Sequence, residues 1–253
     1  MDRPPVIPGI FIAQGMGIRV SGLSLSIDAA GEVTSRIDPI QTRTDVTAVW
    51  LDAAIDRLFD AERSLKTLLG LSDDRSNQIG KVMHNVMQSS MQTITACGIC
   101  TDAYQSSLFE LINISQDIKA RWKSNRTPVY KRTAHIIGRA YRLPNAKVKE
   151  IRLLLKEHTK FRDWAVHPTH EFQEAILNQE TGRSSDWRFA AFNCRNARTI
   201  CRSTLQLISS CSELNKPNLS DEILEHSKNL RNHLVPVIKK WKRRFGDLYS
   251  IES

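Results

Sequence analysis

The 253-residue chain lacks several patterns that would point to a function directly. No apolar run approaches the roughly 20 residues needed to cross a bilayer, so we expect no membrane segment. Met1–Pro5 carries mixed charge and prolines instead of a basic and then apolar leader, so a cytoplasmic protein is expected. Neither a Gly-x-Ser-x-Gly motif nor a glycine-rich phosphate loop occurs, and nothing indicates a nucleophilic serine.

The chain has no dense cysteine framework and no recognisable metal motif. It contains 5 cysteines, an odd number, which is typical of free thiols in a reducing compartment. Cys97 and Cys100 form a CxxC inside a helical stretch without nearby strands, so we interpret them as core residues. His158, His167 and His170 lack the i,i+4 histidine pair with intervening glutamate of a helical zinc site. We therefore expect no metal and no other cofactor.

Acidic residues are missing from one long stretch of an already basic chain. The formal net charge is +9, and no aspartate or glutamate occurs from Ile118 to Lys149. This span holds Lys119, Arg121, Lys123, Arg126, Lys131, Arg132, Arg139, Arg142, Lys147 and Lys149. Such a surface favours an anionic partner, first nucleic acid and second an acidic lipid surface. The alternative is a solvated surface whose acidic partners come from elsewhere in the fold.

The apolar pattern predicts an all-α protein with a small β element at its start. In residues 1–43, alternation over Leu23–Ile27, a turn at Asp28–Gly31 and Val33–Ile37 predict a β-hairpin. Residues 44–212 show apolar spacings of three and four and predict an antiparallel helical bundle. Residues 213–253 predict a C-terminal helical extension, which Ser220 caps and Pro236 bends.

Within the bundle, breakers and periodicity divide the predicted helices. We expect a first helix from Thr44 or Asp45 to about Leu69, and a loop at 178–185. The other predicted helices span about 77–119 (with a break near Gly98), 129–141, 146–165 and 186–212.

The predicted helix at 186–212 carries a stripe of arginines. At 100° per residue, Arg188, Arg195, Arg198 and Arg202 fall in one narrow sector. No acidic residue occurs between Asp186 and Glu213, so these arginines have no i,i+4 partner on their own helix. Guanidinium groups bind phosphate oxygens in pairs, so the stripe predicts contact with RNA. The alternative is pairing with carboxylates of a neighbouring helix.

Arg162 and His167 are the best candidates for catalysis. Pro168 disfavours helical geometry at His167, so the helix should end there and let the histidine converge with Arg162. Asp163, four residues before the histidine, could accept an imidazole N–H. Arg152 and His158, six residues apart on an unbroken helix, point to nearly opposite sides and are set aside. The simpler alternative is an Asp163–His167 helix cap with Arg162 solvated.

The segment Arg162-Asp163-Trp164-Ala165-Val166-His167 resembles the R-x4-6-H motif of the HEPN superfamily. Those proteins are all-α bundles in which a polar residue commonly follows the arginine, as Asp163 does here. The resemblance covers roughly residues 80–212. Some members carry a tyrosine two residues after the histidine, whereas this chain has Thr169, so regulation through tyrosine modification is not expected.

The resemblance implies a metal-independent endoribonuclease, a toxin or antiviral defence effector that works as a homodimer with a composite site. The ribose 2′-hydroxyl would attack the phosphorus, with His167 as general acid or base, Arg162 stabilising the phosphorane and Asp163 assisting. An antitoxin or defence-system partner would fit this class. One alternative is a non-catalytic helical RNA-binding or assembly module on the same fold. Another is a helical scaffold or membrane-surface protein.

Overall fold

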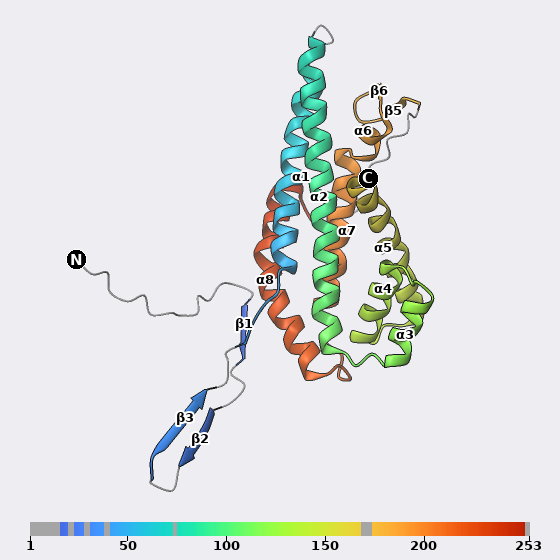
Figure 1. Cartoon of the computed structure of the whole chain (residues 1–253). Helices are drawn as coiled ribbons and strands as arrows, with labels where there is room; N and C mark the ends of the chain where they lie inside the picture. The colour runs from blue at the N-terminus through green and yellow to red at the C-terminus, as the bar shows by residue number, and fades with distance from the viewer. Residues whose placement is uncertain are drawn as a thin grey trace, which may run out of the picture. The chain divides into compact units, whose positions relative to one another are not determined.

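The computed structural model describes residues 16–19, 23–27, 31–37, 41–72, 75–167 and 174–250. The chain divides into two compact units, Met1–Asp45 and Val46–Ser253, each described here by itself. Helices dominate the described residues and the strands are short, so the predicted all-α fold with a small β-hairpin is confirmed (Figure 1).

The first unit contains two antiparallel strand pairs. β2 (Leu23–Ile27) pairs with β3 (Val33–Ile37), and Ile27 lies opposite Val33. This is the hairpin that the alternating pattern predicts, although Asp28–Ala30 of its turn lie outside the described residues. β1 (Met16–Arg19) pairs with β4 (Gln41–Thr44), a pairing that the sequence did not indicate.

The second unit is a bundle built on the long hairpin of α1 (Thr47–Leu69) and α2 (Ser76–Leu111), followed by three successively connected helices. These three are α3 (Gln116–Ser124), α4 (Val129–Ala140) and α5 (Asn145–Val166). The small hairpin of β5 (Ile176–Asn178) and β6 (Arg183–Ser185) comes next. The chain then forms α6 (Trp187–Ala191), α7 (Cys194–Ser212) and α8 (Asp221–Phe245).

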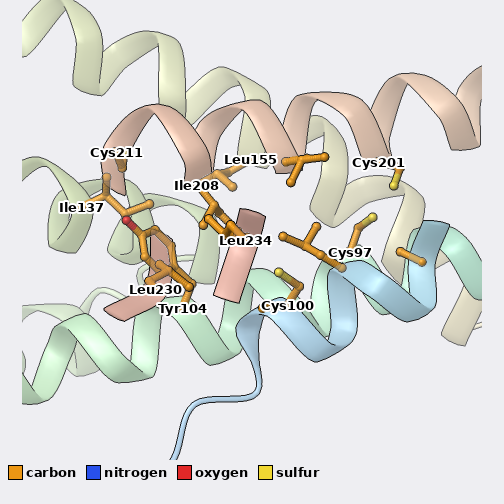
Figure 2. Close-up of a cluster of buried hydrophobic side chains, with 14 of the residues drawn as sticks. Cys97, Cys100, Tyr104, Ile137, Leu155, Cys201, Ile208, Cys211, Leu230 and Leu234 are labelled. Carbon is orange, nitrogen blue, oxygen red and sulfur yellow. The ribbon is translucent and has the colours of Figure 1, made fainter. Parts of the chain in front are cut away.

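One hydrophobic core joins most of these helices. Figure 2 shows Cys97, Cys100 and Tyr104 of α2 facing Cys201 and Ile208 of α7. Helices α4, α5 and α8 contribute Ile137, Leu155, Leu230 and Leu234, and α1 contributes Leu51, Ile55 and Leu58. The apolar face of α8, which includes Trp241, is buried in this core. Residues of the 213–253 segment therefore share the core of the bundle.

Helix α2 corrects the prediction of a break near Gly98. The helix runs without interruption through Gly98 to Leu111, and α3 is a separate helix after it. A Cβ at Gly98 would lie 2.7 Å from Cδ of Arg162, so this glycine makes room for α5 instead of ending α2.

The single helix predicted over 186–212 is also wrong. It is broken at Phe192 and Asn193, where the Asn193 side chain accepts the backbone N–H of Asn196 and caps α7. The predicted loop at 178–185 holds the last residue of β5, the turn and β6, so it is part of an antiparallel hairpin. The Ser220 cap of α8 is confirmed, since its hydroxyl accepts from Ile223 N, and α8 continues through Pro236.

Candidate functional site

The C-terminal end of α5 carries the three predicted catalytic residues. The helix ends at Val166 and His167 is its C-cap, as the sequence predicts, although Pro168 lies outside the described residues. Trp164 packs edge-on against Trp187 of α6 with ring centroids 5.4 Å apart. The helix end is thus anchored by aromatic packing while its last two residues, Val166 and His167, are exposed.

Arg162 is held by two carboxylates from two helices. Its Nη1 donates to Oδ2 of Asp102 on α2 at 3.0 Å. Its Nε and Nη2 donate to Oδ1 of Asp163 at 3.3 and 3.1 Å. The alkyl part of Arg162 passes over Gly98, and 24% of the side chain remains exposed. The guanidinium therefore has a defined orientation, and part of it still faces solvent.

Asp102 is the residue of this site that the sequence did not reveal. Burial raises the pKa of its carboxyl, and the positive charges of Arg162 and Arg132 oppose that rise. Asp163 adds to the rise through like-charge repulsion. Asp102 precedes Arg162 by 60 residues, so only the packing of α2 against α5 brings them together.

The structure places Asp163 and His167 differently from the predicted arrangement. The Asp163 carboxylate binds Arg162, while its backbone carbonyl accepts the His167 backbone N–H at 2.8 Å. Within the described residues, no hydrogen bond joins the carboxylate to the imidazole. Asp163 therefore orients the arginine, and the His167 side chain is exposed.

His158 lies one helical turn before Arg162 and lines the same small pocket as Asp102 and Arg162. Its Nε2 is 2.9 Å from Oγ of Ser203, and its Nδ1 is 3.3 Å from Oγ1 of Thr204. Burial lowers the pKa of His158 to about 4, so the ring is neutral near pH 7. It links α5 to α7. In the sequence, His158 was paired only with Arg152. His158 and Arg162 are four residues apart, a spacing that places both on the same face of α5.

The predicted arginine stripe is largely occupied by contacts inside the fold. Arg198 forms an ion pair with Glu62 of α1 at 3.4 Å and donates to the carbonyl of Phe245 at 3.0 Å. Arg202 donates to the carbonyl of Leu248 at 2.9 Å. These two arginines attach the end of α8 and the residues after it to α7, so the alternative of internal pairing holds for Arg198.

The remaining two arginines of the stripe are not on one helix. Arg188 belongs to α6, where it lies 3.9 Å from Asp186 and over the ring of Trp187. Arg195, in the first turn of α7, is exposed. The angular argument that grouped all four residues therefore fails at the break between α6 and α7.

The basic residues of the acid-free segment, 118–149, are mostly exposed, in contrast to Arg198 and Arg202. The segment forms α3, α4 and the first turn of α5. Among the described residues, its one ion pair joins Lys147 to Glu150 at 2.8 Å. The charge of one member, Arg132, acts on Asp102 of the candidate site. An uncompensated positive surface of the bundle thus lies on α3 and α4.

The cysteines are part of the core. All five are free and buried. Hydrogen bonding with Cys97 and then burial raise the pKa of Cys201, and burial raises that of Cys211 to about 11. Such thiols are poor nucleophiles. No group of three histidine, cysteine or acidic side chains within the described ranges could hold a metal ion.

Comparison with family models, with curated proteins and with solved structures finds no match to this chain. In the part of the chain that the structure describes, no helix combines the length and the apolar character that crossing a membrane requires.

Proposed function

We propose that this protein is a metal-independent endoribonuclease of the HEPN type, with Arg162 and His167 as its catalytic residues. The observation that carries the proposal is the oriented guanidinium of Arg162, five residues before the exposed His167 that caps α5. A guanidinium has five N–H donors, and Asp102 and Asp163 take three, so two remain. Two free donors on an oriented group suit the oxygens of a phosphorane.

The reaction needs a base, an acid and charge stabilisation. The ribose 2′-hydroxyl attacks the adjacent phosphorus, the 5′-oxygen leaves, and a 2′,3′-cyclic phosphate remains. His167 transfers a proton at one of these oxygens, and Arg162 stabilises the charge that develops on the non-bridging oxygens. Asp102 and Asp163 act as positioning residues, because each binds the guanidinium and holds its orientation.

A homodimer supplies the second proton-transfer group in this proposal. One histidine serves only one side of an in-line displacement, while a two-fold axis near the end of α5 adds the His167 of a second copy. The exposure of Val166 and His167 leaves this helix end accessible to such a copy. A toxin or defence effector, with a partner that restrains it, is the biological role that fits an RNA-cleaving dimer.

The test compares cleavage of single-stranded RNA in EDTA by the wild type, Arg162→Ala, His167→Ala and His84→Ala. His84 is an exposed histidine of α2 and serves as the matched control. We expect a 2′,3′-cyclic phosphate product from the wild type and the control, and a loss of at least 100-fold in both site variants. Equal cleavage by all four proteins, or none by the wild type, rejects the enzyme.

A second candidate is a helical RNA-binding module without catalysis. The observation that favours it is the pairing of the Arg162 guanidinium with two carboxylates. These negative charges offset the positive charge that would stabilise a phosphorane. The same experiment separates the two, because this module binds RNA without cleaving it and keeps its affinity in His167→Ala.

A further inference from the structure

The two connections that flank α4 have the same length and the same pattern. Asn125–Pro128 joins α3 to α4, and Tyr141–Pro144 joins α4 to α5. Each has an arginine second and a proline fourth, and the proline is the N-cap of the next helix. Both fall within the acid-free segment, so this repeated turn places one arginine at each end of α4.

Both arginines occupy a backbone conformation that favours glycine. Arg126 has φ 45° and Arg142 has φ 47°, and no other non-glycine residue in the described ranges has a positive φ. Each turn closes with the two hydrogen bonds of a Schellman motif. In the first turn, Thr127 N donates to Trp122 O at 2.9 Å and Arg126 N donates to Lys123 O at 3.2 Å. In the second, Leu143 N donates to Gly138 O at 2.9 Å and Arg142 N donates to Arg139 O at 3.4 Å.

Nothing in the turn itself calls for arginine at these positions. Glycine adopts the left-handed conformation without strain, and asparagine tolerates it. Strain at an exposed position points to a use for the side chain. Arg126 and Arg142 are both exposed, and among the described residues neither guanidinium forms an ion pair. They differ in this from Arg198 and Arg202, which bind partners inside the fold.

We propose that Arg126 and Arg142 are phosphate-binding residues, and that the surface of α3 and α4, not that of α7, binds the RNA strand. This inference rests on the proposed function for the identity of its ligand. α4 has 12 residues and is therefore about 18 Å long.

The position of the Arg126 turn favours RNA over an acidic lipid surface. The turn leads directly into Val129 and Tyr130, which line the small pocket that also holds Asp102 and Arg162. Tyr130 is half-buried, follows Arg126 by four residues, and lines the same pocket as the proposed catalytic arginine. Single-stranded nucleic acids bind to such a combination of basic groups and aromatic rings.

The experiment measures the affinity of a fluorescent 2′-O-methyl RNA 12-mer, which has no free 2′-hydroxyl and so cannot be cleaved. The full chain is compared with Arg126→Gly/Arg142→Gly and with Arg195→Gln, an exposed arginine of α7. We expect the double variant to bind at least tenfold more weakly and to lose about 1.4 from the slope of log affinity against log salt. We expect Arg195→Gln to bind like the wild type.

Thermal unfolding of the same proteins shows whether the double variant is folded. Because glycine relieves the left-handed conformation, its Tm should rise by about 2–4 °C per site. Unchanged RNA affinity in the double variant overturns the inference, as does a fall in Tm, or binding to phosphatidylserine vesicles without binding to RNA.

Cleavage assays on unmodified RNA separate this inference from the proposed function. If the wild type cleaves RNA and the double variant binds RNA with unchanged affinity, the α3–α4 surface is not the binding surface. The proposed endoribonuclease activity then still stands. If the double variant binds RNA more weakly but the wild type cleaves no RNA, the α3–α4 surface binds RNA and the proposed endoribonuclease activity is rejected.

Discussion

Replacement of Gly98 by alanine tests whether the close approach of α5 to α2 positions Arg162. Alanine normally stabilises a helix by about 1 kcal/mol relative to glycine. At Gly98, however, the new Cβ would lie 2.7 Å from Cδ and 3.1 Å from Cγ of Arg162. Carbon atoms pack at about 3.5–4.0 Å, so the arginine must move by about 1 Å.

The matched control is in the same helix. A Cβ at Gly80 has no heavy atom within 4 Å, so Gly80→Ala should gain the full helix-propensity term. We expect its Tm to rise by about 2–4 °C, as about 1 kcal/mol does in a unit of this size. Overpacking costs about 1–3 kcal/mol, so Gly98→Ala should be less stable than Gly80→Ala by that amount.

The assays are thermal unfolding by circular dichroism and RNA cleavage. A displacement of about 1 Å at a catalytic group can reduce the rate by about 100-fold, so cleavage should fall in Gly98→Ala and persist in Gly80→Ala. If both alanine variants gain the same Tm, the Gly98–Arg162 contact does not exist. If Gly98→Ala is destabilised but cleaves RNA normally, the contact exists and Arg162 has no role in catalysis.

Three further predictions concern stability. His158 has a folded pKa of about 4 against about 6.5 when unfolded, so its contribution is complete above pH 6.5 and declines as pH falls toward 4. Urea unfolding at pH 7.5 and 4.5 should show a loss of stability that is smaller in His158→Gln by about 2.5 kcal/mol. Asp56→Asn removes ion pairs to Lys240 and Arg244 at 2.8 and 2.6 Å; its cost of about 1 kcal/mol should shrink in 1 M NaCl. Gly138→Ala places a Cβ 2.6 Å from Cγ2 of Val148 and should cost about 1–3 kcal/mol, with recovery when Val148→Ala is added.

Local sequence patterns predicted the helices well because their causes are local. The apolar spacing of α1 and the serine cap of α8 depend on residues within one or two turns. The β2–β3 hairpin likewise follows from alternation over Leu23–Ile27. The predicted break near Gly98 was wrong, because a helix can contain a glycine in its interior. At Gly98 the close approach of Arg162 leaves no room for a larger side chain.

The break between α6 and α7 shows where a local pattern was misread. Asn193 is an ordinary N-cap residue, yet the apolar spacing continues across it and suggests one helix. Because the angular position of every residue after a break changes, Arg188 could not be placed on the face of Arg198 and Arg202 by counting. Capping chemistry was therefore the better guide at this point.

The sequence alone determined the candidate residues Arg162, Asp163 and His167 and the helix end that carries them. Only the tertiary structure decided the partners of each guanidinium: Asp102 for Arg162, and Glu62 for Arg198. Ion pairs between helices depend on which faces pack together, and helix packing is set by the shape of the whole apolar surface. A residue 60 positions away in the chain therefore orients the proposed catalytic arginine.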